Sequence, residues 1–119
     1  MISDAPVTVS ENATFIAQAK GILSGQEIFD TINMIASNPL VGSVIRGTGG
    51  IRKVRVAISG RGKSGGARVV YYFHNREMPI FLLAVFAKNE KGNLSKSERN
   101  QLKKFVEFTV KEWKKRHPQ

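Results

Sequence analysis

The side chains of this sequence best suited to form a catalytic or anion-binding site are cations that alternate with apolar residues. Lys53 and Arg55 alternate with valines in one predicted strand, and Arg68 and Tyr72 share one face of the next. Because the valines between them must face a core, the cations must face outward, and hairpin pairing would bring Arg68 near both Lys53 and Arg55. Like charges opposite each other on paired strands are destabilising. The cluster therefore indicates a bound anion, or else a solvated face whose cations protect the sheet from aggregation.

A glycine-rich segment, residues 60–66, joins these strands and carries Arg61 and Lys63. It contains a Gly-x-Gly-x-x-Gly pattern, but a nucleotide-binding loop needs a helix after it, and here a Val-Val-Tyr-Tyr-Phe strand follows. Two interpretations remain: a plain hairpin loop, or a basic loop that holds a phosphate backbone. Arg68 is the best candidate to clamp one phosphate, because only guanidinium offers a fixed fork of donors.

Charge is distributed unevenly along the chain. The 119 residues include 19 Lys and Arg against 9 Asp and Glu, a net charge of +10. Residues 46–119 hold 18 of these bases and five acids, a net charge of +13, whereas residues 1–45 have a net charge of −3. A partner with many negative charges is expected, and nucleic acid is the commonest such partner.

Composition excludes several classes of function. The chain has no cysteine, which excludes a disulfide framework, a thiolate zinc site and a cysteine nucleophile. His74 and His117 are the only histidines and lie in different surroundings, so a ribonuclease built on two histidines is not expected, nor is a metal or a cofactor. No apolar run of about 18 residues and no signal-peptide pattern is found. These features indicate a cytosolic protein with no membrane partner.

The elements that position these residues follow from the hydrophobic period. Helical spacing begins after the N-cap residues Asn12 and Ser24, and the second helix ends at Asn38. A period of two then predicts antiparallel strands over 51–59, 67–74 and 79–88. A last helix follows Ser95, with an apolar stripe of Leu102, Phe105, Val106, Thr109 and Trp113.

The predicted fold is α+β, a small antiparallel sheet with two N-terminal helices and one C-terminal helix, all packed on one side of the sheet. Residues 7–9 are either a short edge strand or irregular. Nothing in the sequence marks a boundary between domains. We expect one domain over residues 1–119, with frayed ends at about 1–6 and 115–119.

Three blocks of the sequence carry a resemblance to a known family. They are Gly47-Thr48-Gly49-Gly50-Ile51-Arg52-Lys53-Val54-Arg55, then the segment from Gly60 to Tyr72, then Lys88-Asn89-Glu90. In order and spacing these blocks resemble the RelE/HigB-type toxins of bacterial toxin–antitoxin systems, in particular the second HigB subgroup. The resemblance runs from about residue 15 to residue 110.

The resemblance implies a type II toxin that enters the ribosomal A site, cleaves translated mRNA without a metal, and is inhibited by a cognate antitoxin. Such an mRNA interferase activates the ribose 2′-OH, stabilises a five-coordinate phosphate and protonates the leaving 5′-oxygen. Two alternative functions would also account for the positive charge of the chain. One is a non-catalytic module that binds RNA or the ribosome, and the other is a protein whose basic surface only docks an acidic partner.

The resemblance also implies roles for particular residues. Lys53 and Arg55 match positions where related toxins keep bases, for charge neutralisation or proton transfer, and Lys88 and Glu90 begin a segment where relatives place further active-site groups. The general base stays open between Glu90, Tyr72 and Lys53, and Tyr72 could instead stack on a nucleotide base. The candidate RNA-binding residues outside the catalytic group are Arg52, Arg61, Lys63 and Lys91.

Overall fold

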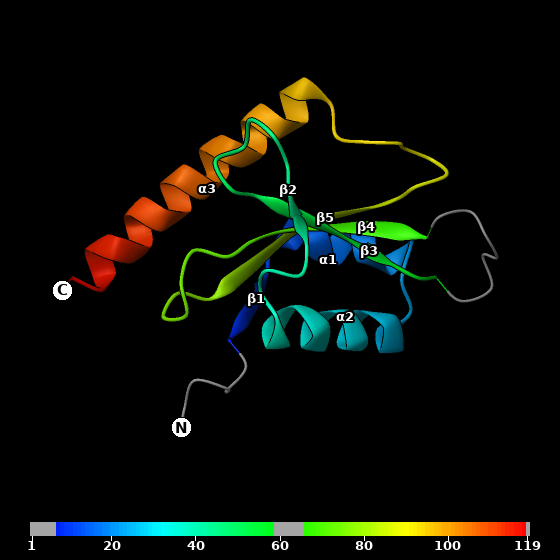
Figure 1. Cartoon of the computed structure of the whole chain (residues 1–119), viewed down its shortest axis with the longest axis horizontal. Helices are drawn as coiled ribbons and strands as arrows, with labels where there is room; N and C mark the ends of the chain where they lie inside the picture. The colour runs from blue at the N-terminus through cyan, green and yellow to red at the C-terminus, as the bar shows by residue number, and fades with distance from the viewer. Residues whose placement is uncertain (1–6, 59–65, 119) are drawn as a thin grey trace.

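The computed structural model describes residues 7–58 and 66–118. In chain order the elements are β1 (Val9–Glu11), α1 (Ala13–Lys20), α2 (Gly25–Ser37), β2 (Ser43–Val44), β3 (Arg52–Val56), β4 (Ala67–Tyr72), β5 (Ile80–Ala87) and α3 (Lys96–Arg116). The five strands form one sheet in the order β1-β5-β4-β3-β2. Figure 1 shows this sheet between α3 on one side and α1 and α2 on the other.

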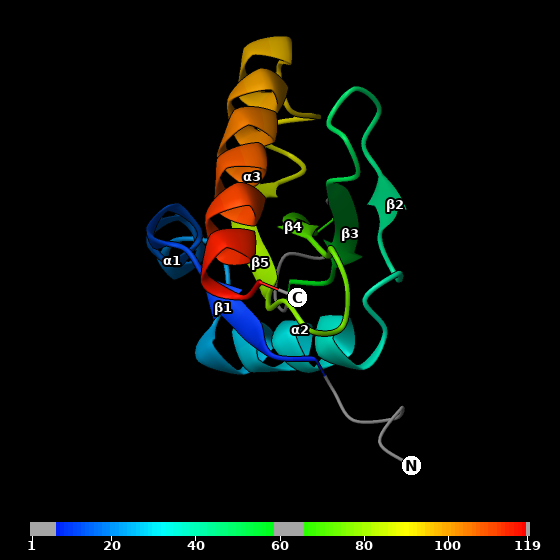
Figure 2. The ribbon, with the colours of Figure 1, turned by 90° about the vertical axis from the view of Figure 1, so that its left-hand side faces the viewer.

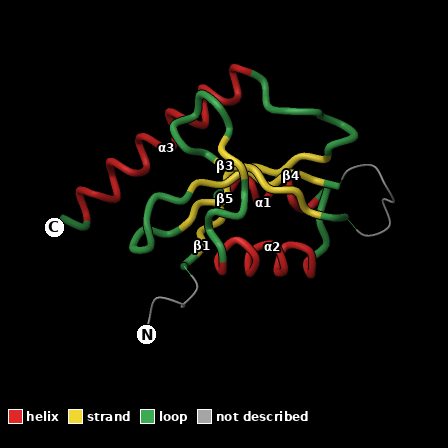
Figure 3. The backbone as a smooth tube through the Cα atoms, in the orientation of Figure 1, coloured by secondary structure: helices red, strands yellow, loops and turns green. Residues whose placement is uncertain are grey.

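The α+β class and the three antiparallel strands are confirmed, with two additions. β3 pairs antiparallel with β4, and β4 with β5, so that these strands lie side by side at the centre of the molecule (Figure 3). β1 joins β5 in parallel, so the sheet is mixed, and it lies two residues later than the predicted segment 7–9. β2 was not predicted, because two residues are too few to show a period. The predicted end of the first strand, residue 59, lies outside the described residues.

Side-chain caps begin all three helices, as the sequence predicts. Asn12 Oδ1 accepts the N–H of Phe15 at 2.8 Å. Ser24 caps α2 through a capping box: its hydroxyl accepts the backbone N–H of Glu27, and the Glu27 carboxylate accepts the backbone N–H of Ser24. Ser95 and Glu98 cap α3 in the same way. Helix α3 continues through Arg116, into the segment where fraying was expected.

Two cores lie on opposite faces of the sheet. The core under α1 and α2 includes Phe15, Ala19, Ile35, Val69, Tyr71 and Leu82. The core under α3 includes Ile45, Ile51, Val70, Leu83, Leu94 and Val106. The prediction that every helix packs on one side is therefore wrong for α3, as the turned view in Figure 2 also shows.

The reason for this error is visible in the central strands. Val69, Val70 and Tyr71 are consecutive and all fully buried, as are Leu82 and Leu83. A strand with neighbouring residues buried is covered on both faces, and only its neighbours in space reveal which helix covers which face.

Helix α3 contacts the sheet through a narrower stripe than predicted. Its packed residues are Leu102, Val106 and Val110, and only Val106 is fully buried. Phe105 is 42% exposed, and the Trp113 ring stacks on a histidine beyond the helix end rather than entering the core. None of the described helices is long and apolar enough to cross a membrane.

Tyr71 connects the sheet to the segment between α2 and β2. Its hydroxyl donates to the Pro39 carbonyl at 2.8 Å and accepts the Gly42 N–H at 2.8 Å, and burial raises the pKa of this hydroxyl. We expect Tyr71→Phe to lower the free energy of unfolding by about 2 kcal/mol, because two buried backbone groups lose their partner. Urea denaturation measures this loss. Tyr72→Phe is the matched control, and an equal effect of both substitutions would contradict the prediction.

Candidate active site

The basic face consists of Lys53, Arg55, Arg68 and Tyr72, on the side of the sheet that α3 covers. Arg68 lies on β4 directly opposite Arg55 of β3, with Phe86 opposite on β5. Lys53 lies two residues before Arg55 and therefore on the same face. The structure thus places on one face the four side chains that the sequence predicts to share it, with Tyr72 farther along β4 than the cations.

The Arg55–Arg68 pair puts two like charges directly opposite each other in the ladder. Arg68 is half-buried, and its Nη1 donates to the Ala67 carbonyl at 3.3 Å, whereas Arg55 is exposed. Such pairing is unfavourable by itself, and an anion bound between the guanidinium groups removes the repulsion. The planar fork of Arg68 is suited to two parallel hydrogen bonds with one phosphate.

Tyr72 forms a pair with His74, which the sequence pattern did not single out. Its hydroxyl oxygen lies 3.0 Å from Nδ1 of His74. Burial raises the pKa of Tyr72, so this hydroxyl keeps its proton at neutral pH. The alternation of strand faces already puts His74 beside Tyr72 in the sequence, and that signal could have identified the pair.

The turn after β5 reaches the basic face through one side chain. Asn93 Oδ1 lies 3.4 Å from Lys53 Nζ and also accepts the Leu94 N–H at 2.9 Å. Lys88 bends back within the turn, where its Nζ donates to the Gly92 carbonyl at 3.0 Å. Glu90 is exposed, and among the described residues its carboxylate forms no ion pair. Asn93 is a neighbour of the basic face that the sequence pattern did not reveal.

Two candidate RNA-binding residues lie elsewhere. Arg52 faces the opposite side of the sheet, across the ladder from Tyr71, and its Nη1 donates to the Gly42 carbonyl at 2.6 Å. Lys91 forms an ion pair with Glu98. Arg52 therefore lies apart from the basic face, because adjacent strand residues point to opposite faces, and its contact with RNA stays a prediction. Arg61 and Lys63 lie outside the described residues.

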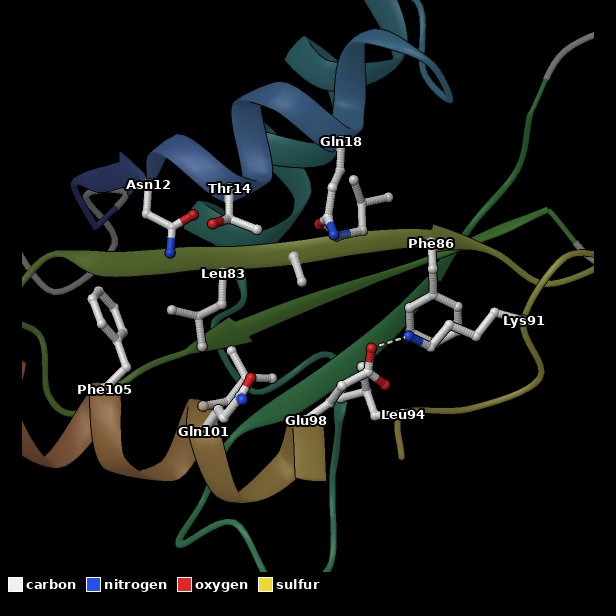
Figure 4. Close-up of a pocket in the computed structure, with 13 residues that line it drawn as sticks. Asn12, Thr14, Gln18, Leu83, Phe86, Lys91, Leu94, Glu98, Gln101 and Phe105 are labelled. Carbon is white, nitrogen blue, oxygen red and sulfur yellow. Dashed lines mark hydrogen bonds and ion pairs between the residues drawn. The ribbon is translucent and has the colours of Figure 1, made fainter. Parts of the chain in front are cut away.

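Lys91 and Glu98 line a separate pocket of about 380 Å³ between α1, β5 and α3. Figure 4 shows side chains of α1 and α3 approaching β5 from opposite sides, with the ion pair at one end. Gln18 Oε1 accepts the Val85 N–H at 3.0 Å, which satisfies a backbone donor on the edge of β5. The charged groups that line this pocket neutralise each other, so it does not offer the positive potential that a phosphate requires.

Glu98 makes the start of α3 sensitive to acid. Hydrogen bonds from Lys91 and from the Ser95 N–H hold the pKa of this carboxyl below its usual range. A carboxyl whose pKa is lowered by folding stabilises the protein above its unfolded pKa, and this contribution disappears as the pH falls through the folded pKa. We expect Glu98→Gln to be less stable by about 0.5 kcal/mol at pH 7, because the pair is partly exposed, and the difference to shrink as the pH falls through and below the usual pKa range of a glutamate.

Thermal unfolding of the two proteins between pH 7 and pH 3 measures this difference. Glu107→Gln removes the same charge from the middle of α3 and serves as the control. A stability difference between wild type and Glu98→Gln that is constant over this range would contradict the prediction.

Fold and site together define a small α+β protein with a cationic sheet face beneath its last helix. Comparison with protein families matches residues 8–116 to the family described as the RelE toxin of the RelE/RelB toxin–antitoxin system. Among solved structures, the chain is similar to the E. coli toxin RelE in its free state, in a mutant with two arginines replaced by alanine. The TM-score is 0.57 at 14% sequence identity, and the match covers 81% of this chain and 96% of that chain.

The family match covers nearly the whole described chain, and the likeness to E. coli RelE supports the same fold. The protein therefore belongs to the RelE toxin family.

Proposed function

We propose that this toxin is a ribosome-dependent endoribonuclease that cleaves translated mRNA in the cytoplasm and so inhibits translation. The observation that carries the proposal is the Arg55–Arg68 pair, with Lys53 next to it and Tyr72 farther along the same face. Clustered cations of this kind stabilise the extra negative charge that a phosphodiester gains when it becomes five-coordinate. Membership of the RelE family supports the same activity.

In the proposed reaction, the ribose 2′-oxygen forms a bond to phosphorus while the bond from phosphorus to the 5′-oxygen breaks. Arg68 binds the non-bridging oxygens, and Arg55 and Lys53 neutralise the developing charge. Tyr72, whose hydroxyl is protonated at neutral pH, donates the proton that the leaving 5′-oxygen needs. The 2′-OH proton passes to a base, for which Lys53 and Glu90 stay candidates; Glu90 would have to approach the face when RNA binds.

A cognate antitoxin is the second proposed partner. Family membership implies such a protein, and the net charge of +13 on residues 46–119 favours an acidic segment in it. An interface of this kind weakens as salt concentration rises. Equal binding at low and high salt would indicate an apolar interface instead.

The chemistry of the cleaved ends tests the proposed function. Attack by the 2′-OH leaves a 2′,3′-cyclic or 3′-phosphate on the upstream fragment and a 5′-hydroxyl on the downstream fragment. We expect these ends on mRNA mapped from programmed ribosomes, and no cleavage where a 2′-deoxynucleotide replaces the nucleotide before the scissile bond. Intact mRNA on ribosomes that have bound the protein would instead favour the non-catalytic module.

A further inference from the structure

A second cationic region adjoins the basic face. A pocket of about 490 Å³ lies between the β2–β3 turn and the start of α3. Figures 1 and 2 show this turn and α3 standing on the same side of the sheet. Four cations line the pocket, from three separate parts of the chain: Arg46, Lys53, Lys96 and Arg99.

Among residues 7–58 and 66–118, no carboxylate lines this pocket; the uncharged polar side chains that line it are those of Asn93 and Asn100. Arg46 and Lys96 are exposed, and neither makes an ion pair within the described part of the chain. Four cations around one concavity without an acid focus a positive potential there. This contrasts with the pocket beside β5, where Lys91 is neutralised by Glu98.

The walls of the pocket are held in place by backbone contacts. Three glycines of the turn have positive φ angles, which residues with a Cβ atom rarely adopt: Gly47 (80°), Gly49 (76°) and Gly50 (113°). Thr48 is buried within this turn, where its hydroxyl donates to the Ile45 carbonyl at 2.6 Å and accepts the Ile51 N–H at 3.1 Å. The turn therefore presents Arg46 from a defined position.

Arg99 is anchored on the opposite wall. Its Nη1 donates to the Leu94 carbonyl at 2.8 Å, which positions the guanidinium at the start of α3 and leaves its other donors available to a ligand. Lys53 lies in both regions, since it belongs to the basic face and also lines the pocket. One extended strand of RNA can therefore pass from Arg68 to the pocket along a continuous row of cations.

We propose that this pocket binds a second phosphate of the same RNA strand, one or a few nucleotides from the phosphate that Arg68 clamps. The proposal rests on the proposed function only in taking RNA as the ligand of the basic face. The ligand group is a phosphodiester, because the pocket offers positive charge and N–H donors on several sides and no acid to repel it. Such a subsite fixes the register of the strand and strengthens binding, while the chemistry takes place at Arg68.

Binding of an RNA that cannot be cleaved tests this subsite without relying on catalysis. The probe is a fluorescein-labelled 2′-O-methyl RNA of eight nucleotides, and its affinity for the full chain is measured by anisotropy over a range of salt. We expect Arg46→Gln/Lys96→Gln/Arg99→Gln to bind roughly 10-fold more weakly at low salt, with a logarithmic salt slope reduced by about 0.7 for each phosphate that the variant no longer neutralises. The double variant Arg46→Gln/Lys96→Gln leaves the Arg99–Leu94 hydrogen bond intact. It should show a smaller loss of affinity and a smaller decrease in salt slope than the triple variant.

Neutral methylphosphonates placed at one linkage at a time locate the second phosphate. Wild-type protein should bind more weakly when either of two separate linkages is neutral. Binding by the triple variant should weaken at only one of these two linkages. The control Lys104→Gln/Lys115→Gln/Arg116→Gln removes three charges from α3 outside the pocket and should keep both sensitive linkages.

Three results would overturn the proposal. The first is that the wild-type protein does not bind the probe, and the second is that its binding is sensitive at a single linkage. The third is that the pocket variants bind RNA normally but bind the antitoxin more weakly, which would make the pocket a protein-binding site. Cleavage on the ribosome is scored separately by product ends. If no cleavage occurs but two linkages are sensitive, the proposed function fails while the subsite stands.

Discussion

Arg68→Ala is expected to lower the single-turnover rate of mRNA cleavage on programmed ribosomes by roughly 10²- to 10³-fold, or about 3–4 kcal/mol. Arg68 is half-buried at the centre of the sheet, and its backbone is fixed in the ladder between β3 and β5. A donor held in this way acts mainly on the charge that develops in the transition state, so affinity for the ribosome should change little.

Two further variants define what the Arg68 result means. Arg68→Lys keeps the charge but not the planar fork, and we expect it to recover less than a tenth of the wild-type rate. Arg76→Ala removes an exposed arginine from the turn between β4 and β5 and should cleave as the wild type does. If Arg68→Ala cleaves at the wild-type rate once ribosomes are saturated, the phosphate clamp lies elsewhere.

The second large effect concerns the ribosome itself. We expect the purified protein to cleave mRNA on a translating ribosome at least roughly 10³-fold faster than the same RNA free in solution. The chain has two histidines, and neither belongs to the basic face, so a site this poor in proton-transfer groups is expected to rely on the ribosome to position the RNA. Positioning of reacting groups can contribute about 7 kcal/mol, which is ample for this difference.

Matched transcripts measure this ribosome dependence. One transcript carries a start codon and ribosome-binding site, the other lacks both, and the rates of appearance of cleaved ends are compared at equal protein concentration. Arg68→Ala should abolish most of the cleavage in either case, which identifies the activity as that of this site. Rapid degradation of the untranslated transcript by the wild type would contradict the prediction.

Local features of the site could be predicted because they depend on neighbouring residues. The strand period places Lys53 and Arg55 on one face of their strand and Arg68 and Tyr72 on one face of the next, and antiparallel pairing then puts both sets on the same side of the sheet. The same period assigns Arg52, a candidate RNA contact chosen for its residue type, to the other face. The period was the reliable signal, because a one-residue shift reverses every side chain of a strand.

Contacts between distant segments could not be predicted in this way. Asn93 reaches Lys53 across 40 positions of sequence, and Arg46 meets Arg99 in one pocket only because the β2–β3 turn packs beneath α3. Nothing in the local pattern around Arg46 or Lys96 distinguishes them from the other bases of the chain. Their common feature is the absence of a carboxylate in the pocket that they line, which is a property of the folded surface.

The helix starts, the three central strands and the cationic face follow from the local pattern of residues, because capping, alternation and burial act over short stretches of chain. Three other features depend on how the whole chain packs: α3 covers the basic side of the sheet, β1 joins β5 in parallel, and a second group of cations lies beside Lys53. Since β4 and β5 each bury apolar residues on both faces, their own pattern admits a helix on either side. Packing of Val106 against Ile51 and Leu83 in one core selects among these arrangements.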